Sequence, residues 1–191
     1  MIMQSQMSRI RRLGFTLIEL LIVVIILAIL AAIVIPQFTS ATSDAKESAL
    51  DANLNSLRSA IELFKVQHGG SMYPGSVATT GGTCAATKGT GAANSAQAFI
   101  DHLLMASDAS GNTCSLGDIA TFKFGPYVRK SIPNDPFMNL GSTASGIVVT
   151  ATGAAIVPAA ATGGWAYDTK SGQIVMNSNG TDTKGIAYYA H

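Results

Sequence analysis

The chain has 191 residues, of which 48% are hydrophobic and only 12% are charged, with a formal net charge of +1. So few basic residues exclude a surface that binds nucleic acid mainly through its phosphates. The length allows one apolar span and one body of about 120 to 150 residues, which is enough for a single hydrophobic core.

The first predicted element is an apolar helix behind a short basic leader. Three arginines precede Gly14, and Glu19 is the only charged residue between Phe15 and Ile35. As a helix, these roughly 21 residues would span about 30 Å, the thickness of the hydrocarbon core of a membrane. Because a carboxylate at that depth costs about 2.5–3.5 kcal/mol on insertion scales, we expect Glu19 to have a partner.

This order of residues resembles the class III signal of type IV pilins and type II secretion pseudopilins. The basic leader, Gly14, Phe15, Glu19 and a long apolar helix that reaches Pro36 carry the resemblance, which is good over residues 9 to about 74 and patchy beyond. In that family a prepilin peptidase cuts after the glycine and methylates the new amino terminus. The resemblance therefore implies a mature chain that begins with N-methylated Phe15.

The resemblance also implies a domain organisation and a fold. Residues 1–14 would be the cleaved leader, residues 15–36 the transmembrane and polymerisation helix, and residues 37–191 the extracytoplasmic head with the amphipathic half of the long helix. The implied class is α+β, the type IV pilin fold, in which the long helix packs on a small antiparallel sheet beside a variable αβ-loop.

Glu19 has two candidate partners in this arrangement. After cleavage, the α-amino group of Phe15 would lie four residues away on nearly the same helix face. Either the two groups of one chain interact, or Glu19 neutralises the amine of a neighbouring subunit, as the family implies. Because desolvation offsets much of the attraction, the role of this pair would be to select the axial register between subunits. The alternative is that Glu19 reaches the lipid headgroups.

Two other interpretations of the N-terminus stay open. An ordinary secretory signal would end in a small-residue cleavage site, but here Ala31 and Ala32 are followed by more β-branched residues. A permanent anchor would give a single-pass periplasmic binding protein or enzyme. Such an anchored monomer should tolerate Glu19→Ala, whereas assembly of a filament should suffer. In either case the arginines keep the leader cytoplasmic and the body outside.

After Pro36 the pattern becomes amphipathic and remains helical. A stripe of large apolar residues recurs at spacings of 4, 3, 4 and 3, typical of a helix face that covers a core. The stripe consists of Leu50, Leu54, Leu57, Ile61 and Phe64. We expect a kink or local unwinding at Pro36, which has no N–H to donate, and a helix end at Gly69-Gly70.

The next segment resembles the variable αβ-loop of a pilin. A loop over residues 75–93 precedes a short helix that Asn94 or Ser95 can cap. Cys84 and Cys114 lie in the part predicted to be outside the cytoplasm, where disulfides persist, so we expect them to pair. Two free thiols are the alternative.

The C-terminal third is predicted to form strands. Candidates are Ile147–Thr150, Gly164–Tyr167 and Gln173–Met176, the last two joined by a hairpin loop. We expect an antiparallel sheet on the long helix, with only one of the two rings of Trp165 and Tyr167, that of Trp165, facing the core. Residues 125–139, with their Asp-Pro pair, resemble the segment before the sheet in major pseudopilins.

One cofactor hypothesis has residues behind it. The segment from Ser178 to Asp182 resembles the calcium-binding loop of major pseudopilins, and calcium requires oxygen ligands such as these. The further acidic residues of that loop are missing, and Lys184 follows. An Asn-Gly turn without metal is the alternative.

We therefore expect a structural subunit of a helical filament anchored in the inner membrane, with a cytoplasmic N-terminus and a head in the periplasm or on the cell surface. A type II secretion pseudopilin that acts in protein export is the favoured interpretation, and a type IV pilus major pilin for adhesion, motility or DNA uptake is the alternative. Expected partners are copies of the chain, other pilins or pseudopilins, prepilin peptidase, an inner-membrane assembly platform and the lipid bilayer, but not nucleic acid. We expect no enzyme activity, because the three histidines are scattered and no nucleophile motif accompanies them.

Overall fold

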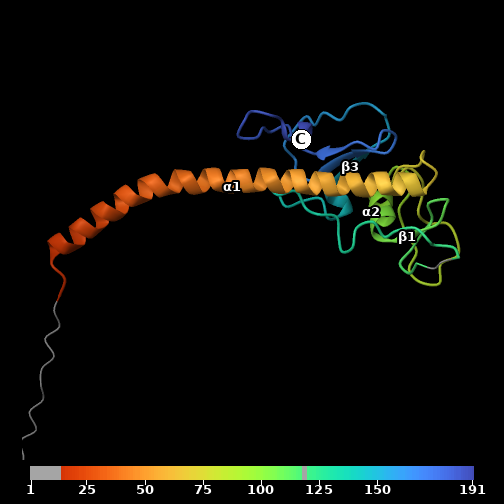
Figure 1. Ribbon diagram of the computed structural model, residues 1–191, viewed down its shortest axis with the longest axis horizontal. Coiled ribbons are helices and arrows are strands. Elements are labelled where there is room, and N and C mark those ends of the chain that lie inside the picture. Colours follow the sequence, from red (N-terminus) through yellow and green to blue (C-terminus); the bar gives the residue numbers. More distant parts are fainter. Residues whose placement is uncertain (1–13, 118–119) are drawn as a thin grey trace, which may run out of the picture. The chain divides into compact units, whose positions relative to one another are not determined.

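The computed structural model describes residues 14–117 and 120–191 of the chain (Figure 1). It contains two compact units, one that ends at Thr42 and one that comprises Ser43–His191. The longest element, helix α1 (Leu17–Gln67), begins in the first unit and ends in the second. Of the predicted leader, only Gly14 belongs to the described residues.

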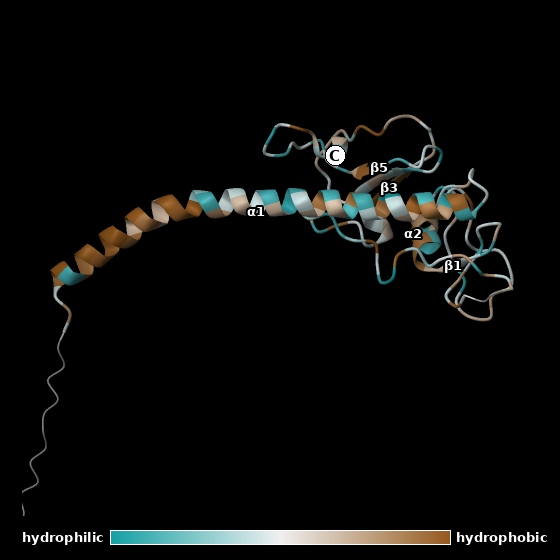
Figure 2. Cartoon of the chain, in the orientation of Figure 1, coloured by the Kyte–Doolittle hydropathy of each residue, from teal (hydrophilic) through white to brown (hydrophobic). Residues whose placement is uncertain are grey.

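In the first unit, α1 is almost wholly apolar. Figure 2 shows this part of the helix as nearly uniformly hydrophobic, whereas hydrophilic and hydrophobic turns alternate farther along. The helix continues through Pro36 without a break, so of the two expectations for Pro36, a kink or local unwinding, the unwinding does not occur, and the kink stays a prediction. A proline removes only one helix hydrogen bond, and the hydroxyls of Thr39 and Thr42 donate back to the carbonyls of Ile35 (3.1 Å) and Phe38 (2.8 Å).

In the second unit, α1 buries the predicted stripe. All five side chains from Leu50 to Phe64 are at most 1% exposed, which confirms the prediction from their spacing. The helix ends where the two glycines follow: Gly69 and Gly70 have φ angles of +80° and +78°, a region that other residues rarely adopt, and the N–H of Gly70 donates to the carbonyl of Lys65 (2.8 Å).

Helix α2 (Ala96–Leu104) is the predicted short helix. Ser95 caps it, because its hydroxyl accepts a hydrogen bond from the N–H of Ala98 at 3.1 Å. Phe99 and Leu103 are fully buried, and the ring of Phe99 lies 4.3 Å from that of Tyr167 between centroids. The helix thus packs into the same core as the side chains of β4 and β5.

The strands form two small sheets. Strands β1 (Ala106–Ser107) and β2 (Thr113–Cys114) pair antiparallel. The second sheet has the order β3–β4–β5, with bounds Ile147–Thr150, Trp165–Asp168 and Ile174–Met176. Short 3-10 helices cover Ala144–Gly146 and Tyr188–Ala190. The α+β class is confirmed, and the strand candidates fall within a residue of the observed bounds.

The direction of β3 differs from the expected one. It runs parallel to β4, with Ile147 opposite Trp165, while β4 and β5 are antiparallel. Parallel neighbours need a connection of about a dozen residues or more, and residues 151–164 supply it. The sheet is therefore mixed rather than wholly antiparallel.

The expectation that only one aromatic ring of β4 faces the core is wrong. Trp165 and Tyr167 are both 0% exposed. Residues two apart in a strand point to the same face, so the two rings enter the core together. The indole N–H of Trp165 donates to the carbonyl of Pro133 at 2.7 Å.

Buried carboxylates hold the long loops of the head. The side chain of Asp168, which is 0% exposed, accepts hydrogen bonds from four backbone N–H groups, those of Thr152, Gly153, Lys170 and Ser171, and from nearby hydroxyls. Although burial by itself raises the pKa of this carboxyl, these hydrogen bonds hold the pKa well below its usual range. One side chain thereby joins the end of β3 to the β4–β5 turn.

Two other aspartates act in the same way. Asp135 (1% exposed) accepts from the N–H groups of Phe137, Met138, Leu140 and Gly164, so it fixes the turn before the sheet. Asp101, on α2, accepts from the N–H groups of Thr90 and Gly91, from the Thr79 hydroxyl and from the Gln97 amide. The αβ-loop is thus attached to α2 through one carboxylate.

Two histidines complete the core near the end of α1. His102 is fully buried; its Nδ1 accepts from the N–H of Gly75 (2.8 Å) and its Nε2 lies 2.8 Å from the Gly111 carbonyl. Burial lowers the pKa of His102 to about 4. His68 stacks on Phe64 at 3.9 Å between centroids. Both rings therefore serve packing.

Candidate functional site

The start of α1 is a reciprocal cap. The carboxylate of Glu19 accepts hydrogen bonds from the backbone N–H and the hydroxyl of Thr16, each at 2.8 Å, and the hydroxyl of Thr16 accepts from the N–H of Glu19 at 3.3 Å. This is the capping box that a threonine and a glutamate three residues later form at a helix N-terminus. Thr16 was not among the predicted site residues, although the Thr-x-x-Glu pattern of residues 16–19 predicts such a cap.

The predicted cleavage position lies open beside this cap. Phe15 is 89% exposed. A Cβ added to Gly14 would meet no atom within 4 Å, so packing of the described chain does not demand glycine there. The adjoining residues of the leader are not among those described. None of the described residues covers the Gly14–Phe15 bond, and cleavage there stays a prediction.

The apolar half of α1 offers an extended hydrophobic surface. Every large hydrophobic residue from Leu17 to Ile35 is at least 42% exposed. By length and composition this helix could cross a membrane, and none of its most apolar window is buried inside the chain. Glu19 lies near its beginning and Pro36 near its end, so the structure does not bring these two predicted assembly residues together.

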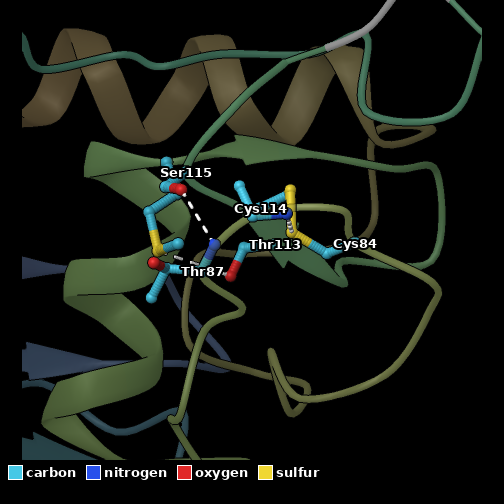
Figure 3. Close-up of a disulfide and its surroundings, with 7 residues drawn as sticks. Cys84, Thr87, Thr113, Cys114 and Ser115 are labelled. Carbon is cyan, nitrogen blue, oxygen red and sulfur yellow. Dashed lines mark hydrogen bonds between the residues drawn. A yellow bond between two sulfur atoms is a disulfide. The ribbon is translucent and has the colours of Figure 1, made fainter.

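The cysteines of the αβ-loop form a disulfide. Cys84 and Cys114 are joined with their Cα atoms 5.6 Å apart (Figure 3). Beside them, Thr87 and Ser115 exchange hydrogen bonds: the N–H of Thr87 donates to the Ser115 hydroxyl (3.1 Å), and the N–H of Ser115 donates to the Thr87 carbonyl (2.9 Å). With Phe122, the bridge forms a small apolar cluster apart from the main core.

The two candidate calcium ligands already have partners. The hydroxyl of Ser178 accepts from the N–H of Gly180 (3.1 Å), and one carboxylate oxygen of Asp182 accepts from the N–H groups of Lys184 and Ile186 (2.8 and 2.7 Å). The described residues contain no group of three or more His, Cys, Asp or Glu arranged to hold a metal ion. This donor set fits calcium poorly, and calcium binding stays a prediction.

Polar contacts that were not predicted from the sequence join the C-terminal segment to α1. Glu47 accepts from the N–H of Thr183 at 2.8 Å, and Asp51 lies 2.8 Å from Nδ1 of His191. The side chain of Arg58 donates to the carbonyl of His191. These charged residues lie outside the apolar stripe of the amphipathic helix. The hydrophobic periodicity of the sequence does not predict which residues they contact.

Comparisons with known proteins agree with this geometry. Residues 9–35 match the prokaryotic N-terminal methylation motif. Over 62 residues the chain is 39% identical to type II secretion system core protein G of Pseudomonas aeruginosa, which covers 32% of this chain and 44% of that protein. Over 54 residues it is 46% identical to a type IV narrow pilus major component of Thermus thermophilus, covering 28% and 47% respectively. The chain thus spans less than half the length of these two relatives.

A further match extends into the head. Over 114 residues the chain is 35% identical to the type IV major fimbrial protein of Dichelobacter nodosus, which covers 57% of this chain and 70% of that protein. The chain belongs to the type IV pilin and pseudopilin family. No solved structure matches the chain. The capped, apolar beginning of α1 lies within the residues that match the methylation motif.

Proposed function

We propose that this pilin is a structural subunit of a helical filament that is anchored in the inner membrane. The observation that carries the proposal is the uncovered apolar surface of α1 from Leu17 to Ile35. Apolar area in water costs about 25 cal/mol per Å², so this half of the helix needs either lipid or other apolar helices around it. The bilayer would hold the single subunit, and helices of other copies would replace lipid in the filament.

The processing and the orientation belong to the same proposal. Prepilin peptidase would cut after Gly14 and methylate Phe15, and the basic leader would have kept the N-terminus cytoplasmic. The inner-membrane assembly platform would then pass the subunit into the filament. Cleavage frees an α-amino group beside Glu19, whose carboxylate is held at the helix start by Thr16 and is therefore placed to meet an amine from a neighbouring copy.

The finer proposal is a type II secretion pseudopilin that acts in protein export. It is supported by the likeness to core protein G and by the Asp-Pro turn before the sheet, where Asp135 accepts four backbone hydrogen bonds. A periplasmic filament of this kind would extend beneath an outer-membrane pore and push exported proteins outward.

A type IV pilus major pilin is the second candidate. The likeness to a major fimbrial protein extends beyond α1, and the disulfide-closed αβ-loop would suit a head that is displayed outside the cell. Mechanical shearing separates the two: a surface pilus releases the chain into the sheared fraction, whereas a pseudopilus at native expression does not.

Substitution of Glu19 tests the shared proposal. Glu19→Ala removes both the cap on Thr16 and the charge, whereas Glu19→Gln keeps a hydrogen-bond acceptor and removes only the charge. Because pairing with a neighbouring amine needs the charge, we expect both variants to lose most filaments in cells, as measured by electron microscopy and sedimentation. Immunoblots of the membrane fraction should show both variants at normal levels.

The matched control is Glu62→Ala. Glu62 is an exposed glutamate on the same helix, 3.8 Å from Lys65, and exposed pairs of this kind contribute little. This variant should assemble like the unaltered chain. Normal filaments from Glu19→Ala would contradict the filament proposal and favour an anchored monomer.

A further inference from the structure

Two histidines hold the same turn from two different helices. Residues 108–112, the β1–β2 turn, are closed by a hydrogen bond from the N–H of Gly111 to the carbonyl of Asp108 (3.1 Å). His68, directly after α1, has its Nε2 3.0 Å from the carbonyl of Asp108. His102, on α2, has its Nε2 2.8 Å from the carbonyl of Gly111. Besides packing in the core, the two rings therefore attach this turn to both helices.

The partners of His102 require a neutral ring. Its Nδ1 accepts a hydrogen bond from the backbone N–H of Gly75 (2.8 Å), so this nitrogen carries no proton. A neutral imidazole has one donor left, and Nε2 donates it to the carbonyl of Gly111. Burial and, to a lesser degree, the charge of nearby His68 lower the pKa of His102 to about 4. The ring therefore keeps both hydrogen bonds in the neutral form.

The partners of His68 require a charged ring. Its Nδ1 lies 2.8 Å from the carbonyl of Phe64, and its Nε2 lies 3.0 Å from the carbonyl of Asp108. Carbonyl oxygens only accept, and a neutral imidazole has a single N–H, so only the doubly protonated ring can donate to both. The hydroxyl of Ser107, 3.2 Å from Nε2, could donate to a neutral ring. The carbonyl of Asp108 would then face the same unprotonated nitrogen.

The surroundings of His68 offset the cost of burying its charge. The ring is only 6% exposed, which disfavours a cation, but it stacks on Phe64 at 3.9 Å between centroids and lies at the negative end of the α1 dipole. The carboxylates of Asp101 and Asp108 accept backbone N–H groups of the loops and make no ion pair with this ring. The charged or titratable side chains on the described segments around it are Lys65, Asp101, His102, Asp108, Lys123 and Tyr127.

We propose that His68 and His102 form a pH-sensitive latch on the β1–β2 turn, in which doubly protonated His68 and neutral His102 each donate to a carbonyl of the turn. The latch is closed while the first ring keeps its second proton and the second ring lacks one. Its opening uncovers Met72 and Val77, since a Cβ on Gly111 would lie 3.3 Å from the sulfur of the first and 2.5 Å from a methyl carbon of the second. The inference concerns the head alone and does not depend on the filament.

The two contacts fail in opposite directions of pH. The pKa of His102 is lowered from 6.5 to about 4, so the stability that this neutral ring contributes is complete above pH 6.5 and is lost as the pH falls through about 4. The contact of His68 uses a proton and is therefore lost as the pH rises and the ring releases it, as histidines do at about pH 5 to 8. In the folded head the latch is thus closed from about pH 4 into the neutral range.

Nitrogen-15 spectra of the imidazole rings test the two protonation states. In the full-length chain, labelled at histidine and held in detergent micelles, the variants His68→Gln and His191→Gln assign the ring signals. At about pH 7 most histidines of the urea-unfolded chain are neutral. The latch predicts two ring protons on folded His68 at that pH and a single proton, on Nε2, on His102. A singly protonated His68 under these conditions overturns the proposal.

Amide hydrogen exchange measures whether the turn is held. At each pH, exchange of the Gly111 N–H is compared between the unaltered chain and His68→Gln, so that the intrinsic pH dependence of exchange cancels. At about pH 6 we expect roughly tenfold faster exchange in the variant, because a charged hydrogen bond to the turn is lost. At about pH 9 the two chains should exchange alike, since the ring of His68 is then neutral. His191→Gln is the control and should match the unaltered chain throughout. The same ratio at both pH values contradicts the latch.

A second variant separates the latch from a neutral His68 that accepts from Ser107. Ser107→Ala removes only the hydroxyl and leaves both carbonyls in place. The latch predicts the same protection of the Gly111 N–H, with the same change with pH, as in the unaltered chain. Faster exchange at every pH would show a neutral ring held by the hydroxyl and would overturn the proposal. If His68→Gln fails to fold, as judged by the fluorescence of Trp165, this variant and the ring spectra still decide.

Discussion

At the scale of single residues, carboxylates decide much of this structure. Asp101, Asp135 and Asp168 are nearly or fully buried, and each accepts several N–H groups from loops that have no strand partner. A buried carboxylate is tolerated only when such donors surround it. The strands of the head are two to four residues long and make few backbone hydrogen bonds with each other. The aspartate side chains accept some of the backbone N–H groups that longer strands would have paired. Thr16 and Glu19 do the same for the start of α1.

The expectation for Asp168→Asn follows from this arrangement. The amide would turn one acceptor into a donor that faces N–H groups, so we expect the free energy of unfolding of the head to fall by about 3 kcal/mol. The fluorescence of Trp165, the single tryptophan, reports unfolding of the detergent-solubilised chain. Asp44→Asn, at an exposed site, should change stability by less than about 0.5 kcal/mol. Equal stabilities for the two variants would refute this role.

The pH dependence has the same origin. Because the folded-state pKa of Asp168 lies below the ordinary value of 3.8, the unfolded chain binds the proton first as the pH falls. The stabilisation is therefore complete above that value and is lost progressively below it. This loss of stability at low pH should be missing in Asp168→Asn, as measured by unfolding at several pH values.

At the scale of elements, periodicity predicted what depends on local sequence. The 4, 3, 4, 3 spacing of the stripe located the buried face of α1, and the candidate caps Asn94 and Ser95 located the start of α2. The direction of β3 was not predictable in this way, because the residue pattern of Ile147–Thr150 is compatible with parallel and with antiparallel pairing. The partners of Asp101 and Asp168 were not predictable either, because most of their donors lie 10 to 22 positions away, without a repeating pattern.

The disulfide gives the element-scale prediction. Replacing Cys84 and Cys114 together by serine opens a loop of about 30 residues, which in the chain-entropy model costs roughly 3–4 kcal/mol. We expect a lower denaturation midpoint by Trp165 fluorescence, and the reductant-treated unaltered chain should match the variant. Helix content by circular dichroism should be unchanged, because α1 makes no use of the bridge. An unchanged midpoint would show that the hydrogen bonds of the αβ-loop, those of Asp101 among them, hold it without the bridge.

At the scale of the whole molecule, the two units differ in what covers their apolar side chains. The head buries Trp165 and Tyr167 and satisfies most of its buried polar groups within one chain. The helix before Thr42 leaves its apolar side chains uncovered and so depends on lipid or on other copies. The apolar half of α1 and Glu19 could be predicted from the sequence, whereas contacts within the head emerge only when the chain is folded, since Tyr127 and Gln67 lie 60 positions apart.

The most direct test of the central claim is the intact mass of the chain extracted from filaments that are purified from the native membrane. The account predicts one species with the mass of residues 15–191, plus one methyl group on Phe15 and minus the two hydrogens of the Cys84–Cys114 disulfide. A chain that retains residues 1–14 and is recovered only as a membrane monomer would contradict it.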